Sequence, residues 1–196
     1  KNIEISEFNP IETIDTNVNG TVNVIKMLIK QKPSKFINIS TDKAADASTL
    51  YGNTKQLGER ITSWAGVHIK GTKSGTVRFG NVRETRGNVF EIWNEENRRN
   101  KPLSITDPTM KRYFIHTNEV IDFILNALLI INKGEIFVPK MKKFSVKELA
   151  NEISKKQKII GLRQGEKIQE ILLNNEEKER AIERKDMWVI NPYKKK

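Results

Sequence analysis

The sequence predicts an α/β fold built on a doubly wound parallel sheet, and the order of its periodic segments carries that prediction. Residues 10–31 have the apolar spacing of a helix, and residues 35–40 contain a short β-branched run typical of a buried strand. Helix and strand then repeat at 50–65 and 76–79. Strands that alternate with helices form parallel sheets, whose sites lie at the carboxyl ends of the strands.

The first predicted helix has clear start and stop signals. Asn9 stands at the N-cap position, Pro10 follows at the first helical position, and Glu12 lies where a capping box requires an acid. Pro33 comes directly after the last periodic residues, so the helix is expected to end before the strand at 35–40.

After Asn81 the predicted elements become shorter and form a smaller second lobe. They are helices near 88–99, 120–132 and 146–155, strands at 103–105, 112–115, 135–138 and 157–160, a short helix that begins at 165, a charged helix over 174–185, and a last strand at 187–190. We therefore divide the chain into a sheet-forming part, residues 1–85, and a part that is mainly the second lobe, residues 86–196. Within the latter, residues 117–139 are expected to return to the sheet.

Composition narrows the class of protein. Hydrophobic residues make up 37% and charged residues 30%, which is typical of a globular protein. The net charge of +11 raises nucleic acid, a membrane surface or an anionic small molecule as partners. The charges are scattered, apart from clusters at 140–143 and in a solvated tail at 194–196, and no nucleic-acid motif is present, so an anionic small molecule is favoured.

Absent features narrow the class further. The sequence has no cysteine, which excludes disulfides, thiolate zinc sites and cysteine nucleophiles, and His68 and His116 lack ligand-like spacing. We expect no metal site. No apolar run reaches membrane-spanning length and no signal-peptide pattern is present, so we expect a cytoplasmic protein without a membrane partner.

The most informative stretch follows the strand at 35–40. A hydroxyl, a carboxylate and an ammonium come directly after it, in Thr41, Asp42 and Lys43. Tyr51 then opens the second helix, and Lys55 lies one turn further along the same face. An ammonium that close favours the phenolate, so we expect the pKa of Tyr51 to lie below its ordinary value of about 10. A Tyr–Lys pair alone also occurs on solvent-facing helices, so the strand and loop before it give the motif its weight.

In this context the chain resembles the extended short-chain dehydrogenase/reductases, and within them the nucleotide-sugar 4,6-dehydratases of polysaccharide biosynthesis. It is most similar to the inverting UDP-N-acetylglucosamine 4,6-dehydratases. Six blocks carry the resemblance in the same order, at residues 7–24, 39–44, 77–82, 85–89, 134–140 and 160–167. The resemblance implies a Rossmann-like sheet for the NADP cofactor, with NAD as an alternative, and a small α/β lobe for a UDP-N-acetylhexosamine substrate.

The resemblance also implies a role for each residue of the motif. Tyr51, as a phenolate, would take the C4 hydroxyl proton while a hydride leaves C4 for NADP⁺. Lys55 would lower the pKa of Tyr51 and bind the nicotinamide ribose. Lys43, when neutral, would remove the C5 proton. Asp42, when protonated, would give a proton to the departing C6 hydroxyl, and Thr41 would hold the substrate or Tyr51.

Four further residues match the positions that hold the nucleotide end of the substrate. Asn81 corresponds to an asparagine that contacts the sugar diphosphate. Arg112, Arg163 and Glu166 correspond to positions that contact uridine and phosphate, which suits a guanidinium fork. The alternative for the two arginines is an ordinary surface salt bridge.

One part of the family pattern is absent. The sequence has no G-x-x-G-x-x-G turn after a strand, so it offers no cradle for a cofactor diphosphate. The chain corresponds to the carboxyl-terminal three-fifths of a typical member. We expect that the preceding segment was lost or is supplied by another chain, or that the chain is a degenerate remnant. A nucleotide-sugar epimerase and a non-catalytic UDP-sugar-binding remnant therefore stay open. The helices at 10–31 and 50–65 match those that relatives pair between subunits, so a homo-oligomer is expected.

Overall fold

The computed structural model describes residues 2–193, so the lysine cluster at 194–196 lies outside the described residues. Its main sheet has five strands in the order β1-β2-β6-β10-β9. The first three are parallel: β1 (Lys35–Thr41), β2 (Lys73–Phe79) and β6 (Ile136–Pro139). The last two, β10 (Met187–Ile190) and β9 (Ala181–Glu183), add as an antiparallel pair. The predicted α/β fold with a parallel sheet is confirmed, and the antiparallel edge adds to it.

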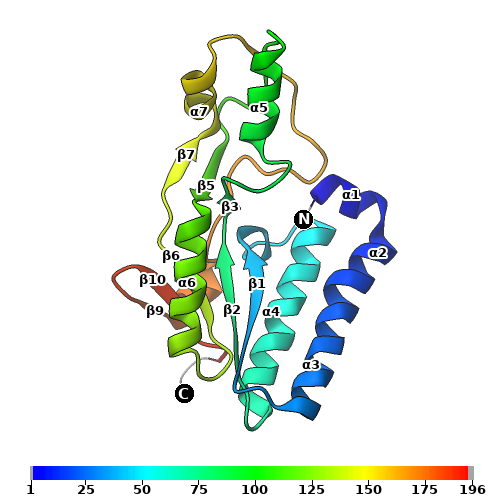
Figure 1. Cartoon of the computed structure of the whole chain (residues 1–196), viewed down its shortest axis with the longest axis vertical. Helices are drawn as coiled ribbons and strands as arrows, with labels where there is room; N and C mark the ends of the chain where they lie inside the picture. Colours follow the sequence, from blue (N-terminus) through cyan, green and yellow to red (C-terminus); the bar gives the residue numbers. More distant parts are fainter. Residues whose placement is uncertain (1, 194–196) are drawn as a thin grey trace.

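Helices cover both faces of this sheet (Figure 1). Successive residues of β2 point to opposite faces, and their partners identify the layers. Arg78 bonds Glu59 of α4 (Leu50–His68), whereas Val77 packs in one cluster with Phe123 of α6 (Thr117–Ile130). Beyond α4 lies α3 (Gly20–Gln31), which packs against it through a small apolar cluster.

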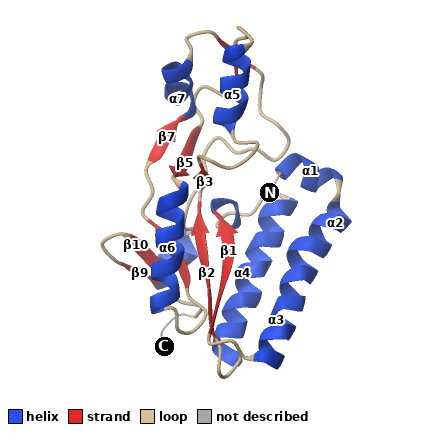
Figure 2. Cartoon of the chain, in the orientation of Figure 1, coloured by secondary structure: helices blue, strands red, loops and turns tan. Residues whose placement is uncertain are grey.

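The second lobe stands beyond the carboxyl ends of β1 and β2 (Figure 2). Its core gathers around Trp93, which is fully buried and donates from Nε1 to the Ser104 carbonyl at 2.8 Å. Its elements are α5 (Val89–Arg98), β4 (Leu103–Ile105), β5 (Lys111–Ile115), α7 (Val146–Ile153) and β8 (Gln157–Ile159), all close to the predicted ranges. Two short strands, β3 (Asn81–Val82) and β7 (Lys143–Ser145), join β5 and were not expected.

The start of the chain differs from the expectation in detail. An unpredicted helix α1 (Ile3–Phe8) precedes the long one, which is formed by α2 (Pro10–Ile14), a π-helical turn at Asp15–Asn19, and α3. Asn9 is the N-cap residue but its side chain makes no cap bond, because its Nδ2 donates instead to the Ile5 carbonyl at the end of α1. The predicted capping box is therefore wrong.

Two predictions near the end of the chain are also wrong. No helix begins at 165, because residues 160–166 form a turn in which the Glu166 carboxylate accepts from the Arg163 backbone N–H at 3.0 Å. The charged segment 174–185 is helical only in α8 (Asn175–Arg180), because Ala181–Glu183 pairs with β10 instead. None of the helices within residues 2–193 is long and apolar enough to cross a membrane.

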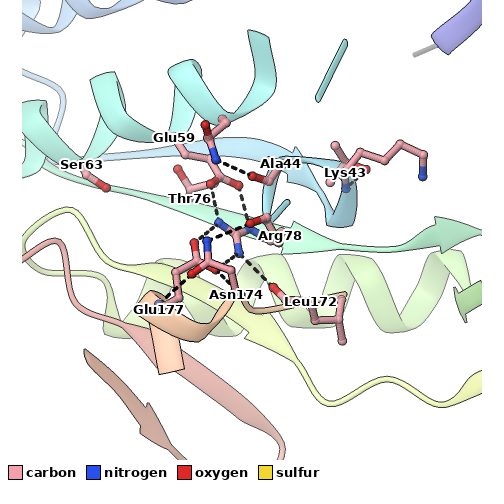
Figure 3. A network of polar contacts seen from close by, with 12 residues as sticks. Lys43, Ala44, Glu59, Ser63, Thr76, Arg78, Leu172, Asn174 and Glu177 are labelled. Atoms are coloured by element: carbon pink, nitrogen blue, oxygen red, sulfur yellow. Dashed lines mark hydrogen bonds and ion pairs between the residues drawn. The ribbon is translucent and has the colours of Figure 1, made fainter. Parts of the chain in front are cut away.

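A buried arginine joins three of these elements (Figure 3). Arg78 of β2 is fully buried, and its guanidinium bonds Glu59 of α4 at 2.9 and 2.5 Å and Glu177 of α8 at 2.8 and 2.6 Å. A fifth bond, of 2.9 Å, reaches the Leu172 carbonyl. All five N–H donors of the guanidinium are thus used, and the segment before α8 is fixed against the sheet.

Candidate active site

Eight of the nine predicted site residues line one cavity of about 490 Å³ between the strand ends and the second lobe. They are Thr41, Lys43, Tyr51, Lys55, Asn81, Arg112, Arg163 and Glu166. The ninth, Asp42, is only 1% exposed and is bonded to Thr41 and Lys43, which line the cavity. The fold therefore brings together residues that are up to 125 positions apart in the sequence, since 166 − 41 = 125.

The two carboxylate oxygens of Asp42 differ in their hydrogen bonding. Its Oδ1 accepts from the Thr41 hydroxyl at 3.0 Å and from the Lys43 ammonium at 3.0 Å. Its Oδ2 is buried and has no hydrogen-bond partner among the described residues. Gly80 leaves space beside this oxygen, because a Cβ there would lie 3.2 Å from Oδ2. A buried carboxylate oxygen without a partner is costly, so Asp42 is suited to take up a proton or to donate one.

Local sequence explains how this group is placed. Thr41 ends β1 and its hydroxyl accepts from the Lys43 backbone N–H at 3.5 Å, which starts a single 3₁₀ turn over Asp42–Ala44. Gly52 lets α4 pack directly on that turn, because a Cβ at this position would lie 2.6 Å from the Lys43 carbonyl oxygen. Thr49 caps α4 by accepting from the Gly52 N–H at 3.1 Å.

Lys43 is held in its charged form. Burial lowers its pKa, but the negative charges of Asp42 and Glu170 together outweigh burial, and the pKa lies above its ordinary value. The Glu170 carboxylate is 3.9 Å from the Lys43 ammonium and only 4% exposed. Glu170 was not among the predicted site residues. Its signal was an acid directly before the apolar run at 171–173, just beyond the last family block.

The expected direction of the pKa shift at Tyr51 is wrong. Burial raises the pKa of the phenol, and the negative charge of Asp42 adds to this. The positive charge of Lys43 and a hydrogen bond with Thr41 oppose the rise without cancelling it. Lys55, the cation expected to lower this pKa, directs its ammonium to the Ile39 carbonyl at 2.6 Å. Burial also lowers the pKa of Lys55 itself, which weakens any effect of its charge.

The four residues expected at the nucleotide end form a second group on the cavity wall. Asn81 donates from Nδ2 to the Tyr113 carbonyl at 3.1 Å. Arg112 donates to the carbonyls of Lys167 and Ile168 at 2.6 and 3.1 Å, so it fixes the loop that carries Glu166. Within residues 2–193, neither Arg112 nor Arg163 forms an ion pair, which removes the surface salt bridge as an account of these two residues.

The cavity fits one end of a nicotinamide cofactor. Ser40, Tyr51 and Lys55 line the same wall, and the buried Ser40 hydroxyl has no partner among the described residues. These donors suit the ribose and carboxamide of such a group. The described residues include no glycine-rich turn that would hold its diphosphate. No cluster of three or more metal-binding side chains occurs within the described part of the chain.

A parallel sheet that carries a Tyr–Lys pair on the helix after a strand end, with a lobe closing a cavity above it, defines an extended short-chain dehydrogenase/reductase of the nucleotide-sugar type. The chain belongs to the polysaccharide biosynthesis protein family, whose profile matches residues 1–192.

Three curated relatives and one solved structure show the range of similarity. A Methanocaldococcus jannaschii protein described as an uncharacterized membrane protein is 37% identical over 98% of this chain and 62% of its own length. The inverting UDP-N-acetylglucosamine 4,6-dehydratase of Campylobacter jejuni is 34% identical over 98% and 59%. The UDP-glucose 4-epimerase of Rickettsia rickettsii is 35% identical over 97% and 58%. The X-ray structure of Pen from Bacillus thuringiensis superposes with a TM-score of 0.92 and 33% identity, over 97% of this chain and 62% of that one. This chain thus spans about three-fifths of the length of each of these four proteins.

Proposed function

We propose that this chain is the substrate-binding and acid–base portion of an NADP-dependent, C5-inverting UDP-N-acetylglucosamine 4,6-dehydratase. Such an enzyme would act in the biosynthesis of surface polysaccharides or nonulosonic acids. The observation that carries the proposal is the hydrogen-bonded pair of Asp42 and Lys43 beside Tyr51. Oxidation at C4 needs one base, which Tyr51 supplies. Dehydration across C5 and C6 needs a further base and a further acid, and this pair supplies both types of group.

Each group has a defined part in the reaction. A bound nicotinamide cofactor would supply hydride chemistry, by accepting hydride from C4 and returning it to C6. Tyr51 takes the proton of the C4 hydroxyl, and the positive charge of Lys43 favours its ionised form. The ketone at C4 makes the C5 hydrogen acidic, which allows an amine to remove it. Thr41 holds Asp42 in position through its hydroxyl.

The protonation states required of Asp42 and Lys43 are reached by moving one proton. Transfer from Lys43 Nζ to Asp42 Oδ1 along their 3.0 Å hydrogen bond gives a neutral amine and a carboxylic acid. Lys43 then takes the C5 proton, and Asp42 gives its proton to the C6 hydroxyl, which leaves as water. The elimination returns the pair to ammonium and carboxylate. When hydride then adds to C6, C5 takes up a proton that has exchanged with solvent, and Tyr51 releases to solvent the proton it took from the C4 hydroxyl, so the whole cycle consumes no net proton.

The remaining site residues suit the nucleotide end of the substrate. The exposed Arg163 and the half-buried Glu166 suit the diphosphate and a ribose hydroxyl of UDP, and Asn81 lies at the adjoining strand end. A homo-oligomer through α3 and α4 is supported by exposed apolar side chains on these helices, among them Met27 at 51% and Trp64 at 47%.

Two other functions have specific support. The Rickettsia relative favours a nucleotide-sugar epimerase, which would use Tyr51 and would not need the proton transfer between Asp42 and Lys43. The match to only about three-fifths of the Campylobacter and Bacillus proteins favours a UDP-sugar-binding portion that is inactive until an amino-terminal segment or chain completes the cofactor site.

Mass spectrometry of a reaction with UDP-N-acetylglucosamine and NADP⁺ in heavy water separates these functions. A dehydratase gives a product that has lost one water and gained deuterium at C5, and Tyr51→Phe abolishes it. An epimerase gives an isomer without loss of water. An unchanged substrate requires the assay to be repeated with the amino-terminal part of a homologous enzyme added. If the completed protein also leaves the substrate unchanged, the proposal of a dehydratase is rejected.

A further inference from the structure

Glu170 has no part in the scheme above, although it is a second buried acid beside the proposed base, after Asp42. Its Oε1 lies 3.9 Å from Lys43 Nζ, on the side away from the main cavity. The two side chains share a small recess with Asp46, Thr49 and Lys167. Because the side chains of Lys43 and Glu170 are only 17% and 4% exposed, the attraction between them is weakly screened.

The segment that carries Glu170 is fixed from both sides. Before it, the Lys111 backbone N–H donates to the Ile168 carbonyl at 3.2 Å. After it, Arg78 donates to the Leu172 carbonyl at 2.9 Å, and Asn174 donates from Nδ2 to the Ala45 carbonyl at 2.8 Å. Figure 3 shows the contact between Arg78 and Leu172, with Asn174 beside Glu177. The carboxylate is therefore held in place by β5, β2 and the turn that bears Lys43.

We propose that Glu170 is a positioning residue for the Lys43 base, a second buried carboxylate that stabilises the ammonium formed when Lys43 takes the C5 proton. The inference rests on the proposed function, which assigns that proton to Lys43. Positive charge develops on Nζ during the transfer, and a fixed negative charge nearby is worth most at that moment. Glu170 would not touch the substrate, because Lys43 lies between it and the cavity.

Other charged side chains also act on Lys43 and Glu170. Asp42, like Glu170, raises the pKa of Lys43, whereas the positive charge of Arg112 lowers it. Burial raises the pKa of Glu170, and the ammonium groups of Lys43 and Lys167 counteract that rise. Removing the charge of Glu170 thus leaves Asp42 as the one strong partner of Lys43 among the described residues.

The test is a titration of Lys43 by NMR in protein labelled with ¹³C at the lysine ε-carbons, with Lys43→Arg used to assign the signal. In Glu170→Gln, which keeps the shape of the side chain, we expect the titration midpoint of Lys43 to fall. Glu152→Gln removes an equal charge from the exposed face of α7 and should leave the midpoint unchanged. Glu170→Asp keeps the charge and should retain a raised midpoint. An unchanged midpoint in folded Glu170→Gln, or a fall as large in Glu152→Gln, overturns the inference.

A second measurement separates this inference from the proposed function. In an active preparation, Glu170→Gln should lower the plateau of the pH–rate profile by about tenfold and move its falling limb to lower pH, because the Asp42–Lys43 pair then loses its shared proton more easily. A structural role alone would lower the rate at all pH values without moving the limb. If the midpoint of Lys43 falls while no preparation dehydrates the sugar, the positioning role stands and the proposed function fails.

Discussion

Replacing Arg78 with methionine gives the most direct test of how the sheet is joined to the segment behind the site. Arg78→Met keeps most of the side-chain volume but leaves two carboxylates, Glu59 and Glu177, buried at 2% and 5% exposure without their cation. Breaking one partner out of a buried ion pair costs about 3–5 kcal/mol. Against a typical domain stability of about 5–15 kcal/mol, that is a large fraction of the free energy of unfolding.

A variant that also removes the two negative charges separates the cost of unpaired carboxylates from the cost of altered packing. In the triple variant Arg78→Met, Glu59→Gln, Glu177→Gln, no charge is left buried, and the main residual cost is the Leu172 carbonyl, about 1–3 kcal/mol. The triple variant should therefore be more stable than the single one. The deficit of the single variant should also narrow as the pH falls from 7 towards 5, because unpaired buried carboxylates take up protons on folding and so gain stability at lower pH.

Urea unfolding followed by circular dichroism measures all of these differences. Arg98→Met is the matched control, because Arg98 is 73% exposed and its ion pair with Glu95 spans 3.4 Å, which is expected to contribute at most about 1 kcal/mol. A loss below about 1 kcal/mol in Arg78→Met would refute the reasoning. So would a triple variant no more stable than the single one.

Three further outcomes are expected. If the proposed function holds, Asp42→Asn in an active preparation should lower dehydratase turnover by about 10²- to 10⁴-fold, the usual contribution of a general acid, and should leave UDP binding measured by calorimetry unchanged. Gly80→Ala places a Cβ 2.7 Å from the Tyr113 Cβ and 2.8 Å from its carbonyl oxygen, so thermal unfolding should show a loss of about 1–3 kcal/mol. Hydrogen bonds, chiefly with His116, lower the pKa of the exposed Glu84 to about 2. The stability this carboxylate contributes is therefore present above its unfolded pKa and lost as the pH falls towards 2, and ¹³C NMR should show its midpoint rising in His116→Ala.

Each of these outcomes has a clear contrary result. Turnover above one tenth of the wild-type rate in Asp42→Asn would remove Asp42 as the acid. An unchanged melting temperature in Gly80→Ala would show that the end of β2 can accommodate a Cβ at position 80 despite the short distances to Tyr113. A midpoint for Glu84 near its ordinary value in the unmodified chain would mean that the bond to His116 does not persist in solution.

Much of the sheet and the inner site follows from local sequence. The segment from 35 to 68 is one strand, one turn and one long helix, so the spacing of its residues fixes where Thr41, Lys43 and Tyr51 point once the helix begins at Leu50. Asn81 could be placed because parallel strands end at one edge of a sheet, and β2 pairs with β1 in register up to Phe79.

Features that depend on distant partners could not be predicted in this way. Ala181–Glu183 has the charged composition of its helical neighbour and becomes a strand only because β10 offers a partner. The direction of the pKa shift at Tyr51 depends on burial and on Lys43, which the four-residue spacing to Lys55 did not reveal. Glu170 was overlooked because it lies 127 residues after Lys43, since 170 − 43 = 127.

The buried charges also show how the two parts of the chain depend on each other. A boundary near residue 85 describes the order of the sequence, yet it would separate Arg78 from Glu177, 99 residues away, and Lys43 from Glu170. Without Glu177 and the Leu172 carbonyl, Arg78 would keep one carboxylate partner among the described residues, and Lys43 would lose the buried carboxylate of Glu170. Because a weakly screened charge is what makes Glu170 effective, the electrostatics of the proposed base depend on α8 and its preceding segment as much as on β1.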